Sequence, residues 1–318
     1  MSKLRVGFVG CGGRNRRGHM SIMSAFDDIE MAAVCDPVAE AMDGAGEQYG
    51  ISARFESVEA MLDGADLDAV VVATPTHLNA VAAQPCLERG IDTLLEKPPG
   101  MTFSETLALR DAANRTGAKG MVGFQRRFHP MVTRAREMIA ERGLVTQIVG
   151  EFHKSMTREV ESGVHHESVL ENVIMETPIH AIDLVRAVAG SDVVEVHAVV
   201  RKAISKYNDV HAALVLFENG CVAQIVANYT TDARLQRYEF HGRDISAYLE
   251  GISEGVLVYD GKRESLQDPR GTGGGYELDR HFIDCVKEDR PISPPACDLD
   301  GAVKTMELTE AIVAGLRD

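Results

Sequence analysis

Lys97 lies in an unusual setting for a lysine, between an apolar run and two prolines. Residues 94–100 read LLEKPPG, so Lys97 follows a short strand-like stretch, and the prolines after it fix φ and remove two backbone N–H donors. A lysine at such a rigid strand end is suited to act as a positioned acid or hydrogen-bond donor. Lys97 and its neighbour Glu96 are therefore candidate ligand contacts. The alternative is a surface lysine at a turn.

A glycine-rich loop follows the first strand-like run and opens a helix. Residues 6–20 read VGFVGCGGRNRRGHM. The first glycine of GCG makes the tight turn, and the next lets backbone N–H groups approach a pyrophosphate at the helix N-terminus. The third glycine of the G-x-G-x-x-G pattern is replaced by asparagine. The predicted cofactor contacts in this loop are Gly10, Gly12, Gly13, Arg14 and Asn15. The alternative is a tight turn without a ligand.

An acidic residue ends the second strand-like run, AVCDP. Asp36 lies where a carboxylate accepts hydrogen bonds from the ribose hydroxyls of an adenosine. Because a carboxylate repels a 2′-phosphate, we predict NAD as the cofactor. NADP stays open, since Arg14, Arg16 or Arg17 could bind that phosphate. These arginines could equally form a solvated helix face.

The run VVVATPTHLNA places further polar groups at the carboxyl edge of the same predicted sheet, where open parallel sheets bind ligands. We expect this segment to line the cofactor, through Ala73, Thr74, Pro75 and His77. The alternative for His77 is a helix-capping or solvent-facing side chain.

The elements that position these residues are readable from hydrophobic patterning. From Leu4 to residue 124, short β-branched runs alternate with helix-like segments, which predicts a doubly wound parallel sheet and a Rossmann domain over residues 1–124. Two of its helices carry terminal signals. One is predicted to start after Ser57 and stop at Gly64, and the other to start at Ser104 and stop at Gly117.

The second half has a different hydrophobic pattern. Residues 125–318 are predicted to form an α+β domain with a large, mostly antiparallel sheet. QIVGEFHKS is a predicted strand, and Asn219-Gly220 is a type I′ hairpin signal between two alternating runs. Two amphipathic helices end the chain, and the last could pack back on the first domain. The Gly-rich stretch at 271–276 is expected to be a mobile loop or a substrate lid.

Composition excludes several classes of protein. The chain has 318 residues and a formal charge of −15, which argues against nucleic-acid binding and against anionic membranes. Six scattered cysteines without a C-x-x-C pair are expected to be free thiols. The N-terminus shows no leader, and no window approaches a membrane span. We therefore expect a cytoplasmic protein.

Six motifs, in this order along the chain, resemble those of the glucose-fructose oxidoreductase, inositol 2-dehydrogenase and rhizopine-catabolism family, known as Gfo/Idh/MocA. The motifs are Gly10-Cys11-Gly12, Asp36, ATPTHLN, EKP at Glu96–Pro98, GFQRRFHP at Gly123–Pro130 and ETPIHAIDL at Glu176–Leu184. The resemblance implies a Rossmann domain followed by a sheet domain that forms homodimers or homotetramers. It also implies that Lys97 contacts both the reacting group and the nicotinamide side of the cofactor.

The same resemblance implies a substrate-binding acid and a catalytic histidine at Glu176 and His180. Spacing of i, i+4 and i+7 predicts that Glu176, His180 and Asp183 share one helical face. An imidazole is suited to take the O–H proton as hydride leaves a secondary alcohol. Asp183 either binds substrate, orients His180 or caps nearby backbone. The alternative for His180 is a structural histidine.

Two departures from the family concern the substrate. The usual Gly-rich run is replaced by LENVIMET, and the acid is the longer Glu176. We expect Lys154 or Arg158 to bind an anionic group on the substrate. Arg126 or Arg127 either reaches the site or forms a structural salt bridge. We predict no metal, although His165, His166 and Glu167 are adjacent.

These features predict an NAD(P)-dependent oxidoreductase acting on a secondary hydroxyl or ketone of a sugar, cyclitol or related polyol, with Lys97 and His180 as the acid/base pair. One alternative uses NAD without net redox, for glycoside cleavage, elimination or hydration through a transient keto sugar. The other is a non-catalytic, nucleotide-sensing binding protein.

Overall fold

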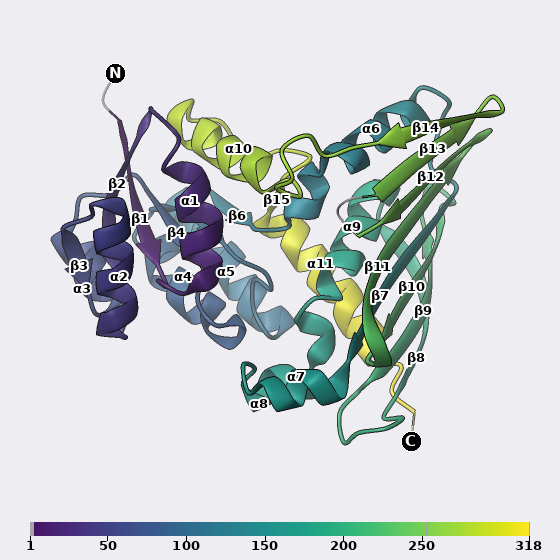
Figure 1. The fold of residues 1–318 in the computed structure, drawn as a ribbon, viewed down its shortest axis with the longest axis horizontal. Coiled ribbons are helices and arrows are strands. Elements are labelled where there is room, and N and C mark those ends of the chain that lie inside the picture. Colours follow the sequence, from purple (N-terminus) through teal and green to yellow (C-terminus); the bar gives the residue numbers. More distant parts are fainter. Residues whose placement is uncertain (1–2, 252–253, 318) are drawn as a thin grey trace. The chain divides into compact units, whose positions relative to one another are not determined.

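The computed structural model describes residues 3–251 and 254–317 and divides the chain into two compact units (Figure 1). Unit 1 comprises Met1–Phe124 and Gly275–Val303, and unit 2 comprises Gln125–Gly274 and Lys304–Asp318. The outer limits of the two predicted domains, Met1 and Asp318, lie outside the described residues. No helix in the described ranges is long and apolar enough to cross a membrane.

Unit 1 is built on a seven-stranded sheet that is parallel except for one edge strand. Its central strands are buried on both faces, which explains their unbroken apolar sequences. The order places the carboxyl ends of β5, β4 and β1 next to one another. The strands are, in spatial order, β15 Cys297–Asp298, β6 Gly120–Val122, β5 Asp92–Leu95, β4 Ala69–Val72, β1 Leu4–Val9, β2 Ile29–Cys35 and β3 Ala53–Phe55.

The helices of unit 1 follow the predicted alternation. Ser57 caps α3, Val58–Gly64, as expected, by accepting a hydrogen bond from the Ala60 N–H. The predicted start of α5 at Ser104 is wrong. The helix is Phe103–Thr116, because Thr102 and Glu105 form a reciprocal capping box. The remaining helices are η1 Asn15–His19, α1 Met20–Met23, α2 Ala39–Tyr49, η2 Thr76–Leu78, α4 Asn79–Glu88 and α10 Gly275–Lys287.

The structure departs from the predicted domain limits near the C-terminus. The boundary after Phe124 coincides with the unit boundary, but residues 275–303 belong to unit 1. Arg280 on α10 binds Asp28 at 2.9 Å, and β15 pairs with β6 through Cys297 and Val122. These contacts complete the unit 1 sheet and its helical cover. The last helix, α11 Leu299–Val313, begins in unit 1 and ends in unit 2.

Unit 2 is built on an eight-stranded sheet, mostly antiparallel as predicted, in which β7 and β10 form a parallel pair. With unit 1, it confirms the predicted fold class. The predicted strand QIVGEFHKS is β7 without adjustment. The strands are, in spatial order, β14 Lys262–Leu266, β13 Glu254–Tyr259, β12 Ile245–Glu250, β11 Thr230–Gly242, β7 Gln147–Ser155, β10 Val222–Asn228, β9 Val210–Phe217 and β8 Val193–Arg201.

The predicted hairpin joins β9 and β10, but its turn type was wrong. A type I′ turn needs positive φ at both central residues, whereas Gly220 has a φ of 83° and Asn219 is not among the residues with positive φ. The Gly220 N–H donates to the Phe217 carbonyl, and the Phe217 N–H donates to the Cys221 carbonyl. The loop is therefore a three-residue connection with its left-handed residue at glycine.

One face of the unit 2 sheet is covered by α9, Ile179–Ala189. The helix approaches the sheet closely at Gly150, where a Cβ atom would lie 2.9 Å from Val185. Because α9 starts after Pro178, Glu176 lies in the turn before it. The prediction that Glu176, His180 and Asp183 share one helical face is wrong for Glu176. The other helices are η3 Gln125–Phe128, α6 Pro130–Ala140, α7 Met156–Ser162, α8 Glu167–Glu171 and η4 Val173–Met175.

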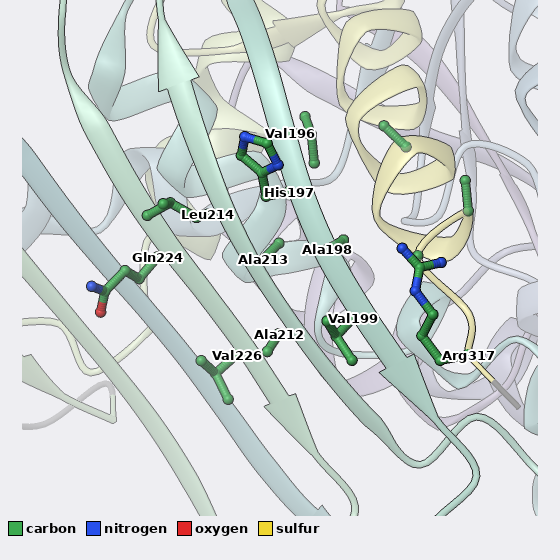
Figure 2. Close-up of a pocket in the computed structure, with 13 residues that line it drawn as sticks. Val196, His197, Ala198, Val199, Ala212, Ala213, Leu214, Gln224, Val226 and Arg317 are labelled. Atoms are coloured by element: carbon green, nitrogen blue, oxygen red, sulfur yellow. The ribbon is translucent and has the colours of Figure 1, made fainter.

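The opposite face of β8, β9 and β10 carries exposed apolar side chains (Figure 2). In register across the three strands, Ala212 lies between Val199 and Val226, and Leu214 lies between His197 and Gln224. Val199 is 48% exposed and Leu214 is 45% exposed. This face, called the outer sheet face below, is therefore an apolar surface in the isolated chain.

Candidate cofactor and substrate sites

The glycine loop has the geometry that a bound pyrophosphate requires. Gly10 has a φ of 85°, and a Cβ atom there would collide with the Ala73 carbonyl. The turn therefore needs glycine at this position for two reasons, backbone conformation and space. Gly12 faces open space, with no atom within 4 Å of the position of a Cβ atom. A phosphate can therefore approach this backbone, and the loop fits a dinucleotide.

Asn15 replaces the third glycine and has a structural task. Its side-chain amide donates to the carbonyls of Gly10, at 2.7 Å, and Val9, at 3.3 Å. It also begins η1, a π-helical turn in which the Met20 N–H donates to the Asn15 carbonyl. Such turns insert one extra residue into a helix and occur often at functional sites.

Asp36 fixes the backbone of the loop through its carboxylate. Its carboxylate accepts from the Cys11 N–H at 2.7 Å and from the Val38 N–H at 2.9 Å. An ionised carboxylate has about four acceptor positions, so capacity remains for ribose hydroxyls. Two of the arginines considered for a 2′-phosphate have other partners: Arg16 donates to Gln48, and Arg14 pairs with Glu96. This arrangement favours NAD.

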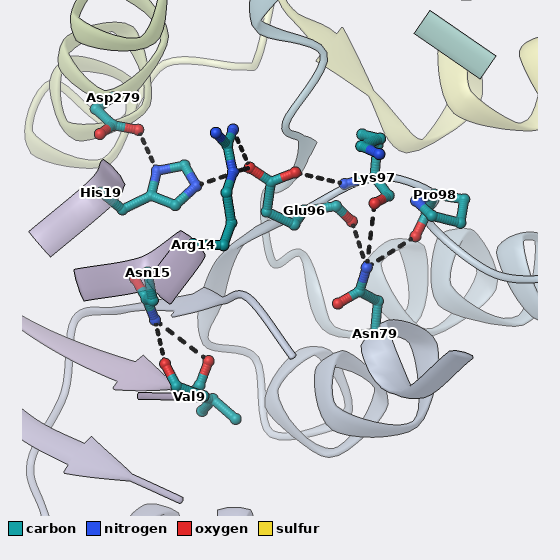
Figure 3. A network of polar contacts seen from close by, with 10 residues as sticks. Val9, Arg14, Asn15, His19, Asn79, Glu96, Lys97, Pro98 and Asp279 are labelled. Carbon is teal, nitrogen blue, oxygen red and sulfur yellow. Dashed lines mark hydrogen bonds and ion pairs between the residues drawn. The ribbon is translucent and has the colours of Figure 1, made fainter. Parts of the chain in front are cut away.

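The turn that carries Lys97 is fixed by hydrogen bonds to its backbone (Figure 3). The Asn79 amide lies 3.2, 3.4 and 3.3 Å from the carbonyl oxygens of Glu96, Lys97 and Pro98. Thr74 donates to the Asn79 side-chain oxygen at 3.0 Å, and the Lys97 N–H donates to the Glu96 carboxylate at 3.1 Å. The edges of β4 and β5 are thereby joined. His77 lies half-buried in η2.

A buried ionic network contacts this turn through the Glu96 side chain (Figure 3). The His19 ring lies 2.6 Å from Asp279 Oδ1 and 3.2 Å from Glu96 Oε1, and Arg14 also pairs with Glu96. Burial alone would lower the pKa of His19, but Asp279 and Glu96 outweigh it and raise the pKa to about 9. Burial opposes ionisation of Glu96, while Arg14 and His19 hold its pKa well below the usual range. His19 is therefore a cation between two carboxylates.

In unit 2, His180 lies in the first turn of α9 and is buried. One turn later, Asp183 is engaged by a buried arginine. Arg127 donates to its two oxygens at 2.8 and 2.6 Å, and Thr305 donates to Oδ1 at 3.0 Å. The geometry supports the structural salt bridge considered for Arg127. Arg127 in η3 is thereby bound to Asp183 on α9, the helix that carries His180.

Five polar side chains meet at the end of β7, and we call them the Lys154 cluster: Lys154, Glu159, His165, Glu176 and Tyr229. Lys154 Nζ lies 3.0 Å from Glu159 and 3.1 Å from Glu176, and His165 lies 2.8 Å from Glu159. The Thr177 hydroxyl donates to Glu176. The expectation that Lys154 binds an anion is disfavoured, because two carboxylates already surround its ammonium.

Arg158 and the adjacent histidines do not extend this site toward an anion or a metal. Arg158 pairs with Asp232, and both side chains are mostly exposed. His166 caps α8, whose Glu167 pairs with Lys206. Over the described ranges 3–251 and 254–317, no group of three or more His, Cys, Asp or Glu side chains is placed to hold a metal ion.

The sequence predicted the elements in which several of the candidate residues lie, but it did not reveal their hydrogen-bond and ion-pair partners. Asn79 and His19 stand inside motifs that the sequence displays, so their positions were a usable signal. Asp279, Glu159 and Tyr229 come from distant segments without a recognisable pattern. The structure brings together the cofactor candidates and Lys97 within unit 1, and Glu176, Lys154, His180, Asp183 and Arg127 lie in unit 2.

The sheet order, the glycine loop and Asp36 define a dinucleotide-binding Rossmann unit followed by a sheet unit. Residues 4–124 match the model of an oxidoreductase family with an NAD-binding Rossmann fold, and residues 132–248 match the model of the Gfo/Idh/MocA C-terminal domain. The chain therefore belongs to the Gfo/Idh/MocA family of NAD-binding oxidoreductases.

Similar proteins cover nearly the whole chain. An inositol 2-dehydrogenase from Rhizobium meliloti is 27% identical over 99% of this chain and 97% of its own length. A D-apiose dehydrogenase from Paraburkholderia graminis is 26% identical over 100% of this chain and 89% of its length. The solved structure of UDP-N-acetylglucosamine 3-dehydrogenase from Acidithiobacillus ferrooxidans has a TM-score of 0.83 at 23% identity, covering 99% and 98% of the two chains. This structural likeness shows the shared fold.

Proposed function

We propose that this protein transfers a hydride between NAD and a secondary hydroxyl or ketone of a sugar, cyclitol or related polyol. The observation that carries the proposal is the position of Lys97. Its turn is fixed by Asn79 and Glu96 just beyond β5, on the sheet edge that also bears the glycine loop. The names of the relatives above, which are dehydrogenases of inositol, D-apiose and UDP-N-acetylglucosamine, support this substrate class.

The two units divide the work. Unit 1 holds the cofactor, and its fit rests on the open space over Gly12 and the acceptor capacity of Asp36. Unit 2 binds the substrate. The residues assigned to the cofactor are Gly10, Gly12, Gly13, Arg14, Asn15, Asp36, Ala73, Thr74, Pro75, His77, Glu96 and Lys97. Those assigned to the substrate are Lys97, Lys154, Glu176, His180, Asp183 and Arg127. Since Arg14, Glu96, Asp183 and Arg127 are engaged in ion pairs, they act mainly by fixing their neighbours.

In the direction of oxidation, the substrate hydroxyl loses its proton while the carbon that bears it loses hydride. Bound NAD supplies the hydride acceptor. We assign the role of base to His180. Lys97 stabilises the alkoxide that develops or passes its proton on. Glu176 accepts a hydrogen bond from a neighbouring hydroxyl of the substrate.

The test is a panel of sugars and cyclitols with NAD and with NADP, followed by absorbance of the reduced cofactor. Lys97→Met removes the ammonium and should lower kcat by about 10²–10⁴-fold. The matched control is Lys202→Met, which changes an exposed lysine in unit 2. Full activity of Lys97→Met would refute the mechanism. Absence of turnover across the panel would refute the function, and cofactor that co-purifies without dependence on added NAD would favour the route without net redox.

Two further assignments accompany this function. We propose a cytoplasmic location, which cell fractionation tests. We also propose that the protein is a homodimer or homotetramer in which the outer sheet face is covered by a second copy. The support is the apolar character of that face, with Val199 and Leu214 exposed in the isolated chain.

A further inference from the structure

Asp279, His19 and Glu96 form a buried chain of side chains that ends on the backbone of Lys97 (Figure 3). The side chains of Asp279, His19 and Glu96 are 0%, 6% and 5% exposed. The His19 ring contacts Asp279 through Nδ1 and Glu96 Oε1 through Nε2. The other oxygen of Glu96, Oε2, accepts from the Lys97 N–H. A side chain of α10 is thereby linked to the lysine turn through two intermediate side chains.

The Lys97 N–H is the single backbone donor of residues 97–99, because Pro98 and Pro99 have none. Its bond to Glu96 fixes the turn through a donor, and the contacts of the Asn79 amide fix it through carbonyl oxygens. Because the Cα–Cβ bond moves with the backbone, an anchored backbone determines where the Lys97 side chain begins. Glu96 can hold the N–H in place only while its own carboxylate is fixed.

Two cations fix that carboxylate. His19 and Arg14 both contact Glu96 Oε1, which leaves Oε2 directed at the Lys97 N–H. The His19 ring also faces Asp279, so it needs a proton on both nitrogens, which only the imidazolium has. Its pKa, raised to about 9, agrees with this state. The charged groups around the ring come from three elements: Asp279 of α10, Glu96 and Lys97 after β5, and Arg14 of the glycine loop.

Stability alone does not explain this arrangement. Taking two carboxylates and a histidine out of water is costly, and apolar side chains of similar volume often stabilise a fold equally well or better. A network of directed hydrogen bonds provides something that an apolar core does not, which is one defined orientation for each group that it holds. The group oriented at the end of this network is the Lys97 N–H.

We propose that His19 and Asp279 are positioning residues for the catalytic lysine. Through Glu96 they fix the backbone of Lys97, and they thereby direct its ammonium toward the reacting oxygen. The proposal rests on the role assigned to Lys97 in the function proposed above. It adds α10, which lies near the C-terminal end of the sequence, to the elements on which the chemistry depends.

The first measurement is kcat of His19→Gln and of Asp279→Asn, with NAD and the best sugar of the panel. Because a displacement of about 1 Å can cost about 100-fold in rate, we expect kcat to fall by about 10–100-fold in both variants. The Kd for NAD, measured by calorimetry without substrate, should stay close to the wild-type value. Both losses should disappear in a Lys97→Met background, because the ammonium that these residues position is then absent.

The second measurement follows the Lys97 N–H itself in the cofactor-free protein. Selective ¹⁵N-lysine labelling gives hydrogen-exchange rates for Lys97 and for Lys119, whose N–H also donates to a carboxylate within unit 1, at 2.7 Å. In His19→Gln and in Asp279→Asn, the exchange rate of Lys97 should rise at least about 10-fold relative to that of Lys119. A purely structural role would leave this ratio unchanged, because a less stable unit 1 exposes both amides.

The matched control is His281→Gln, the same substitution at another histidine of unit 1. His281 lies on α10, as Asp279 does. Burial and the Arg290 charge lower the pKa of His281, so its electrostatic surroundings differ from those of His19. Both kcat and the exchange ratio should stay at their wild-type values in this variant.

Each outcome bears on a specific statement. Faster exchange at Lys97 together with a lower kcat supports the proposal. Wild-type kcat in both variants would overturn the positioning role and leave the oxidoreductase function standing. An equal rise at Lys97 and Lys119 would show that the network only stabilises unit 1, which also overturns the proposal. Faster exchange at Lys97 alone, without turnover of any sugar, would refute the function and leave the positioning of the Lys97 backbone standing. Asp279→Asn keeps the shape of its side chain, so it carries both measurements if His19→Gln does not fold.

Discussion

Replacing His19 with glutamine should remove a pH dependence of stability that the buried network creates. The pKa of His19 is raised from 6.5 to about 9 because Asp279 and Glu96 flank its ring. A group whose pKa is raised in the folded state contributes stability that is fully present below the unfolded value. That contribution is lost as the pH rises through the folded value. The wild-type protein should therefore lose stability between pH 6.5 and about 9.

The size of the effect follows from the same shift. At about 1.4 kcal/mol per pKa unit, the rise to about 9 corresponds to about 3 kcal/mol of unfolding free energy. The measurement is pulse proteolysis in urea at about pH 6 and about pH 9.5, with mass spectrometry of peptides from β1 and β4 to follow unit 1 alone. The wild-type midpoint should fall over this range more steeply than that of His19→Gln.

Parallel midpoints in the two proteins would refute the assignment of His19 as a buried cation. The control is His197→Gln, because His197 lies in unit 2 and should leave the pH profile of unit 1 unchanged. Titration of the His19 ring by NMR gives a second readout. Its chemical shifts should stay constant through pH 7 and move only as the pH approaches about 9.

Three other outcomes are expected. Asp36→Ser should raise KM for NAD by about 10–100-fold, because charged hydrogen bonds contribute about 1.5–3 kcal/mol each. The same change should reduce the preference of the protein for NAD over NADP. Arg127→Met should destabilise unit 2 by about 3–5 kcal/mol by leaving Asp183 buried and unpaired, and adding Asp183→Asn should recover most of this loss. Leu214→Asp should dissociate the oligomer, as read by light scattering, with the tertiary structure retained.

Each of these outcomes has a contrary result. Unchanged discrimination between NAD and NADP would remove Asp36 from the ribose site. If Arg127→Met raised KM for the sugar without changing stability, Arg127 would be a substrate-binding residue and not a structural one. For Leu214→Asp the control is Val38→Asp, since Val38 is 58% exposed in unit 1 and should leave the oligomer intact.

The sequence predicted those helices and strands whose signals lie within the element itself. The strand β7 was predicted over its full length because the residue composition changes clearly at both of its ends. Signals that compete within a few residues were harder to interpret. Thr102 and Ser104 are both good caps, and the glutamate three residues after Thr102 decided the start of α5. Pro178 is equally local, and it disfavours helix for the residue before it, which excludes Glu176 from α9.

The partners of the site residues required the tertiary structure. Nothing near His19 indicates Asp279, which is 260 positions away in the sequence. Tyr229 reads as an ordinary strand residue, and its significance comes from Glu176 and Glu159, which reach it from other segments. The charge of Lys154 suggested an anion, because a sequence shows the lysine without the two carboxylates that flank it.

The return of residues 275–303 to unit 1 has a consequence for how the protein is made. The strands β1 to β6 leave the ribosome first, yet their edge strand β15 and the Asp279 that pairs with His19 emerge after most of unit 2. At about 5–20 residues per second, residues 125–274 take roughly 8–30 s to synthesise. During that interval the nascent Rossmann sheet has an open edge at β6, and His19 has Glu96 but lacks Asp279. All residues of unit 1 have therefore been synthesised once residue 303 is added, whereas unit 2 also needs the residues that follow, and a chain cut at residue 274 would leave both units unfinished.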